Sequence, residues 1–69
     1  MIKLHYVGGI ITLISKEDIQ AFKTIEKECQ RLIDNGILNI CERWEYITYC
    51  MHEQNMIDEC LPITGYSCL

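Results

Sequence analysis

The chain has 69 residues, of which 49% are hydrophobic and 23% are charged, and its formal net charge is −4. This balance excludes a disordered chain, and the length allows a single domain with a thin hydrophobic core. Residues 35–69 carry the whole charge excess, since they hold Glu42, Glu45, Glu53, Asp58 and Glu59 against Arg43 alone. This excess disfavours nucleic acid and anionic membranes as partners and favours a basic protein.

The first predicted element is a β-hairpin over residues 2–14. Its two strands flank the dipeptide Gly8-Gly9, and a two-residue glycine loop is typical of tight antiparallel turns. The loop sets a register in which Val7 faces Ile10. The core side of the hairpin is then expected to carry Ile2, Leu4, Tyr6, Ile11 and Leu13.

The opposite side of the hairpin is too apolar for a surface that meets only water. Besides polar residues it carries Val7, Ile10 and Ile14. The strand edges of a two-stranded sheet are also open to pairing with another strand. We therefore predict that these three residues contact a partner protein, a second copy of the chain, or both.

A helix is predicted over residues 16–34. Ser15 followed by Asp18 is typical of a helix start, and Asn35-Gly36 is typical of a left-handed helix end. Apolar side chains recur at helical spacing along one face, namely Ile19, Phe22, Ile25, Cys29, Leu32 and Ile33.

A second helical region is predicted over residues 40–60. Asn39 and Glu42 form a possible capping pair, and a buried stripe is expected to contain Ile40, Trp44, Ile47 and Met51. Beyond His52 the stripe moves around the cylinder, so the helix is either buried on two sides or breaks near "HEQN", and Pro62 ends it. A competing interpretation makes "WEYITYCM" a strand.

These elements together predict a small single α+β domain. An N-terminal β-hairpin would pack on two, or possibly three, helices, and residues 62–69 would form a tail. The N-terminal apolar stretch has no small-residue cleavage site, and no segment is long enough to span a membrane. We therefore expect no membrane contact.

The five cysteines are an odd number without a CxxC pair, which fits reduced thiols and a cytoplasmic location. In "CMHEQNMIDEC" one helix would align His52, Met56 and Cys60, whose side chains suit copper(I). The ends of that row lie ~12 Å apart, so one ion could contact only two neighbours. We therefore expect no metal and no cofactor, and keep a metal or thiol sensor as the second alternative function.

No catalytic residues are predicted, and we expect that the chain is not an enzyme. His5 or His52 could act as a base for any of the five cysteines, but no catalytic motif selects one of these pairs. A single thin core also leaves little room for a deep pocket.

The favoured function is a small non-enzymatic protein-interaction module. It would act as an inhibitor or regulator that occupies a surface of a larger, possibly nucleic-acid-processing protein, and a homodimer is also expected. The predicted partner-binding residues are Val7, Ile10, Ile14, Trp44, Glu45, Tyr49 and Glu53. The first alternative is a helix-turn-helix-like DNA-binding regulator, although its reading helix would carry several acids.

Overall fold

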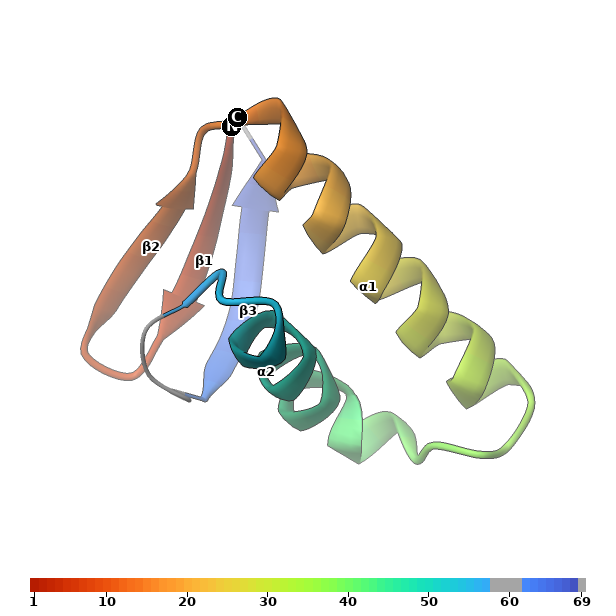
Figure 1. The fold of residues 1–69 in the computed structure, drawn as a ribbon. Helices are drawn as coiled ribbons and strands as arrows, with labels where there is room; N and C mark the ends of the chain where they lie inside the picture. Colours follow the sequence, from red (N-terminus) through yellow and green to blue (C-terminus); the bar gives the residue numbers. More distant parts are fainter. Residues whose placement is uncertain (58–61, 69) are drawn as a thin grey trace.

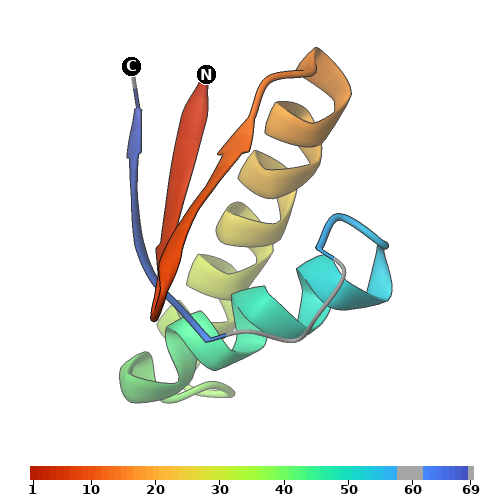
Figure 2. The ribbon, with the colours of Figure 1, turned by 90° about the vertical axis from the view of Figure 1, so that its left-hand side faces the viewer.

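The computed structural model describes residues 1–57 and 62–68. Its elements are β1 (Ile2–Tyr6), β2 (Gly9–Leu13), α1 (Lys16–Asp34), the 3-10 turn η1 (Ile40–Glu42), α2 (Arg43–Glu53) and β3 (Ile63–Cys68). The three strands form an antiparallel sheet in the order β2-β1-β3, and both helices cover the same face of it (Figures 1 and 2). The predicted α+β class, with an N-terminal hairpin and two helices, is confirmed.

The hairpin forms where it was predicted, but its loop is Val7-Gly8 and not Gly8-Gly9. Tyr6 pairs with Gly9, whereas the predicted loop would pair Tyr6 with Ile11. Gly8 has a φ of +109°, which side chains rarely allow, and a Cβ on Gly9 would meet the hydroxyl of Tyr6 at 3.0 Å. The register is thus displaced by two residues, and because side chains alternate with period two, each keeps its predicted face.

The hairpin therefore separates a buried side from an exposed side as expected. Ile2, Leu4 and Leu13 are buried under the helices, and Tyr6 and Ile11 are half-buried. On the opposite side Val7, Ile10 and Ile14 remain 76%, 55% and 75% exposed. No element of the described part of the chain covers this outer side.

The predicted tail contains a third strand, which corrects the expectation of a two-stranded sheet. β3 pairs with β1 along its length, with one irregularity between His5 and Tyr6. The backbone N–H of Ile63 donates to the hydroxyl of Thr48, on α2, at 3.1 Å. Because β3 is attached to α2 in this way, β2 is the more open edge of the sheet.

The bounds of α1 agree with the predicted helix. The hydroxyl of Ser15 accepts a hydrogen bond from the backbone N–H of Asp18 at 3.0 Å, which caps the first turn. At the other end the N–H groups of Gly36 and Ile37 donate back to carbonyls of the last turn, at 3.1 and 3.0 Å. This pattern ends the helix at a glycine with a φ of +73°.

Replacing Gly36 with alanine should therefore destabilise the protein by about 1–2 kcal/mol, because an L-residue is strained at this φ. A Cβ at Gly36 would meet nothing within 4 Å, so the whole cost comes from the backbone. Gly65 also has open space around it but no positive φ, and it lies in β3. Gly65→Ala is the matched control, and urea unfolding should show a loss for Gly36→Ala alone; equal effects would contradict the assigned helix end.

The second helix forms over "WEYITYCM", so the strand interpretation is wrong. α2 ends at Glu53, and Asn55 takes a φ of 58°, so the chain breaks at "HEQN". The predicted helix over 40–60 is therefore too long: residues 54–57 lie outside it, and 58–61 lie outside the described residues. Asn39 does cap η1, but Ile40 is 67% exposed and not part of the buried stripe.

One hydrophobic core lies between the sheet and the two helices. Phe22 is 1% exposed, and its ring contacts that of Tyr66 edge-on with centroids 5.2 Å apart. The core consists of Ile2, Leu4, Leu13, Phe22, Ile25, Cys29, Ile47, Met51, Ile57 and Ile63. All three strands and both helices contribute to it, so one continuous core joins the sheet and the helices.

Candidate interaction surfaces

Six of the seven predicted partner-binding residues lie on two separate surfaces. Val7, Ile10 and Ile14 form the first, which we call the hairpin surface. Ile10 lies on the opposite side of β2 from the buried Leu13, and Val7, in the turn, and Ile14, directly after β2, are also exposed. Glu45, Tyr49 and Glu53 form the second, the α2 stripe, whose members are all exposed. Trp44 belongs to neither, because it is half-buried against the core. One small partner cannot cover both surfaces at once.

The hairpin surface adjoins the open edge of the sheet. β2 pairs only with β1 among the described strands, and this pairing is regular over all five of its residues. The stretch from Gly9 to Ile14 contains no charged residue and no proline. Edge strands of soluble proteins usually carry such residues or a bulge, which prevent pairing with other chains. The edge of β2 is therefore available to another strand.

A serine and a histidine that the sequence did not bring together meet on the same outer side. The Nε2 of His5 lies 3.1 Å from the hydroxyl of Ser67, across the pairing of β1 with β3. A nucleophile and a base at this distance would still need an orienting group and a pocket. Among the hydrogen bonds of residues 1–57 and 62–68, His5 has no carboxylate partner, and the pair lies on an open sheet face.

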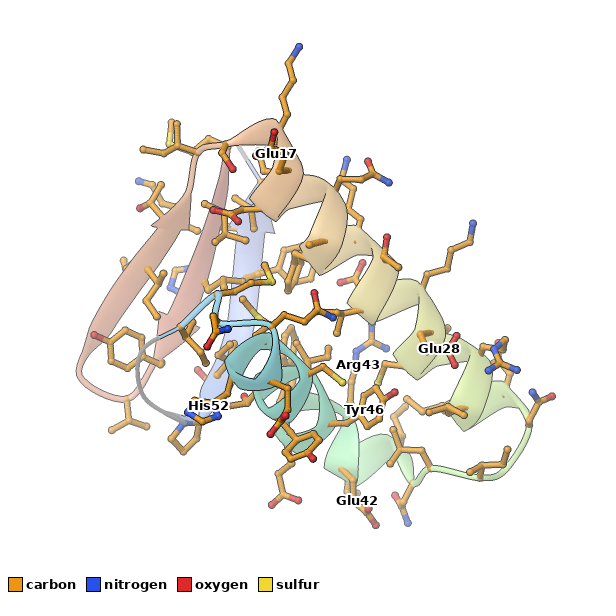
Figure 3. The ribbon with its side chains drawn as sticks, viewed as in Figure 1. Glu17, Glu28, Glu42, Arg43, Tyr46 and His52 are labelled. Atoms are coloured by element: carbon orange, nitrogen blue, oxygen red, sulfur yellow. The ribbon has the colours of Figure 1, made fainter. Side chains whose placement is uncertain are left out.

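The α2 stripe is acidic, and the arginine beside it does not neutralise it. Glu45, Tyr49 and Glu53 follow one another at intervals of four, so they share a face of α2. Arg43 points toward α1, where it donates to Gln30 at 2.8 Å (Figure 3). The exposed side of α2 therefore presents carboxylates around an aromatic ring.

The contacts of Arg43 belong to a polar cluster that joins three elements. Its guanidinium lies 4.0 Å from the carboxylate of Glu26, on α1, and 6.0 Å from the ring centroid of Trp44. Hydrogen bonding with Glu26 raises the pKa of the Tyr66 hydroxyl, on β3. The rings of Tyr66 and Trp44 also meet edge-on at 6.0 Å. This cluster links α1, α2 and β3.

A groove opens between α2 and the beginning of β3, and we call it the α2–β3 groove. Its volume is about 340 Å³, near the lower end of ligand sites at roughly 300–1,000 Å³. It is lined by Cys41, Trp44, Glu45, Thr48, Pro62 and Ile63. Thr48 and Ile63 are buried and form its floor, while Cys41, Glu45 and Pro62 are exposed and form its rim.

The cysteines and histidines do not assemble into a metal site in the described residues. No group of three His, Cys, Asp or Glu side chains comes together in residues 1–57 and 62–68. Because α2 ends at Glu53, the predicted helical row of His52 and Met56 does not form, and Cys60 lies outside the described residues. Cys29 is fully buried, and burial raises the pKa of its thiol.

No helix in residues 1–57 and 62–68 is both long enough and apolar enough to cross a membrane. The chain matches no protein-family model, no curated protein and no solved structure. Its function is therefore inferred from the two surfaces and the groove.

Proposed function

We propose that the chain is a small non-enzymatic protein-interaction module, an inhibitor or regulator that occupies a surface of a larger protein. One observation carries this proposal: β2 is an open edge strand with apolar, exposed side chains beside it. A partner strand could pair with the free backbone groups of β2 while its side chains cover Val7, Ile10 and Ile14. Full burial of each of these side chains would stabilise the complex by about 1.5–3 kcal/mol before the costs of association.

Self-association follows from the same feature. Two copies of β2 can pair antiparallel about a two-fold axis, and because β2 carries no charge, no like charges would meet across that axis. Such pairing would join two three-stranded sheets and remove both open edges. The acidic α2 stripe, on the other side of the sheet, would stay free to contact a basic protein.

The charge of α2 disfavours the DNA-binding alternative. In a helix-turn-helix arrangement α2 would be the reading helix, yet its exposed side carries Glu45 and Glu53, and Arg43 points toward Gln30. Carboxylates so close to phosphates would oppose binding. A salt-sensitive shift of labelled duplex DNA at low ionic strength would support the alternative, and no binding under these conditions would exclude it.

The proposal predicts the effect of charging the hairpin surface. Ile10→Lys together with Ile14→Lys should leave the melting temperature nearly unchanged, because both side chains are exposed, and should abolish self-association and partner binding. The matched control is Ile37→Lys together with Ile40→Lys, which charges two similarly exposed isoleucines, one between α1 and η1 and one at the first residue of η1. Native mass spectrometry reads the oligomeric state of all three proteins.

A photo-crosslinking amino acid at position 10 identifies what covers the hairpin surface in cells. A product of twice the chain mass would show self-association, and a product with one larger protein would show a partner. In both cases Ile14→Lys should remove the product, while the same crosslinker at position 37 should not form it. If position 10 gives no product beyond that of position 37, the hairpin surface is not an interface and the proposal is wrong.

A further inference from the structure

The α2–β3 groove, with a volume of about 340 Å³, is large enough to take one bulky apolar side chain. Its floor is made by Thr48 and Ile63, and the ring of Trp44 forms a wall. The hydroxyl of Thr48 already accepts from the N–H of Ile63 and donates to the carbonyl of Trp44, at 3.1 and 2.7 Å. These polar groups are therefore satisfied without a ligand, and an apolar side chain could fill the groove without leaving them unpaired.

The charge around the groove determines which kind of segment could carry that side chain. Glu45 is part of both the groove rim and the α2 stripe, and Glu42 lies one turn before it. From residue 38 to residue 57 the sequence contains no lysine and only one arginine, Arg43, which is directed toward α1. Lysine or arginine next to the anchor would therefore meet these carboxylates. The guanidinium of Arg43 lies 6.0 Å from the ring centroid of Trp44, but it is already engaged with Gln30 and Glu26 of α1.

We propose that the α2–β3 groove binds a basic protein segment that inserts one bulky apolar or aromatic side chain between α2 and β3. Trp44 would contact the anchor, and Glu45 and Glu42 would contact the flanking cations. This inference rests on the proposed function, since it treats the chain as an interaction module. It concerns a different surface, however, because the groove is lined by residues of η1, α2 and the beginning of β3, whereas the hairpin surface lies on β2 and the residues next to it.

The chain contains two reporters of binding at this groove. Trp44 is its only tryptophan, so a change in intrinsic tryptophan fluorescence reports on the groove wall. Cys41 is an exposed thiol on the rim, and a bound segment should slow its alkylation. Cys68 is also an exposed thiol but lies at the far end of β3, paired with Ile2, and serves as the internal control.

The test uses the full chain and a short synthetic peptide that carries one Phe flanked by Lys and Arg. The peptide should change the fluorescence of Trp44 and slow the alkylation of Cys41 but not of Cys68. Replacing its Phe with Ala should weaken binding about tenfold or more, as expected for an anchor residue. Replacing its Lys and Arg with Glu should abolish binding. Equal binding of the Phe and Ala peptides would overturn the groove as an anchor site.

A charge-reversed pair of variants tests the rim. Glu45→Lys should weaken binding of the basic peptide about tenfold or more, and should make the affinity less sensitive to salt. Glu17→Lys makes the same change in net charge at the start of α1, at the opposite end of the molecule from Glu42 (Figure 3), and should leave the affinity within about twofold. Equal losses in the two variants would indicate a general charge effect and overturn the site.

Failure of this inference can be told apart from failure of the proposed function. If the peptides leave the fluorescence of Trp44 and the alkylation rate of Cys41 unchanged while position 10 still gives a crosslinked product, the groove is not a binding site. The hairpin surface then remains the proposed interface. If the peptide binds and position 10 gives no crosslinked product, the groove is a binding site and the hairpin surface is not an interface. Melting curves of Glu45→Lys and Glu17→Lys should show similar small losses, because each replaces an exposed acid in the first turn of its helix with a cation.

Discussion

Phe22→Ala should lower the free energy of unfolding by about 3–5 kcal/mol and leave much of the chain unfolded. Phe22 is 1% exposed in the first half of α1, and its ring contacts Tyr66 of β3. Removing the ring loses the free energy of burying its apolar surface. It also leaves a cavity between α1 and the sheet. A domain of this size rarely has more than about 3–5 kcal/mol available from its core, so the loss is comparable with the whole stability.

Urea unfolding followed by circular dichroism measures this loss. Lys23→Ala removes an exposed side chain from the next position of α1 and should change the stability by no more than about 0.5 kcal/mol. Phe22→Leu keeps most of the volume and should be less damaging than Phe22→Ala. A melting temperature for Phe22→Ala close to that of Lys23→Ala would mean that α1 is rotated about its axis relative to this structure.

Thr48→Val should destabilise the protein by about 1–3 kcal/mol, although the two side chains have nearly the same shape. Thr48 is 3% exposed, and its hydroxyl accepts the hydrogen bond from the backbone N–H of Ile63. Valine cannot accept it, so a buried donor at the beginning of β3 would lose its partner. Because this bond attaches β3 to α2, hydrogen exchange of β3 amides should speed up more than that of α1 amides.

Thr24→Val is the matched control for this substitution. Thr24 donates its hydroxyl to the carbonyl of Gln20, four residues earlier in α1, just as Thr48 donates to the carbonyl of Trp44 in α2. Thr24 is exposed and accepts no hydrogen bond from another element of residues 1–57 and 62–68. The difference between the two threonine variants therefore isolates the acceptor role of Thr48 and its burial. Equal stability of the two would show that the N–H of Ile63 does not depend on Thr48.

The position of Thr48 also links stability to the proposed groove. Thr48 and Ile63 are held together by this hydrogen bond and form the groove floor. Loss of the bond would allow the beginning of β3 to move away from α2. Thr48→Val should consequently weaken binding of the basic peptide as well, whereas Thr24→Val should leave it unchanged.

The features that local interactions control could be predicted from the sequence. Ser15 and Gly36 mark the ends of α1 because capping hydrogen bonds and a positive φ involve only the adjacent residues. The break at "HEQN" follows from the failure of one apolar stripe to continue, and Asn55 tolerates the left-handed conformation there. The exposed side of the hairpin could be predicted because side chains along a strand alternate between the two faces of the sheet. A register change of two residues leaves each side chain on the same face.

The features that depend on distant contacts could not be predicted in this way. β3 is a six-residue strand that contains Gly65 and Ser67, so its own pattern is weak, and it forms because β1 offers it a partner some sixty residues earlier. The hairpin loop moved to Val7-Gly8, where the ring of Tyr6 occupies the space beside Gly9. The groove likewise needs α2 and β3 side by side, which no local pattern encodes.

The sequence by itself thus determined the α+β class, the bounds of α1 and the apolar outer side of the hairpin, because each depends on propensity, capping or periodicity within one segment. It left residues 44–51 open between helix and strand, and the structure makes them part of α2. Only the tertiary structure decided that the predicted binding residues divide between opposite sides of a sheet, and that Trp44 and Glu45 border a groove. These outcomes arise from packing between segments far apart in the chain, whose contacts are set by the three-dimensional arrangement and not by sequence spacing.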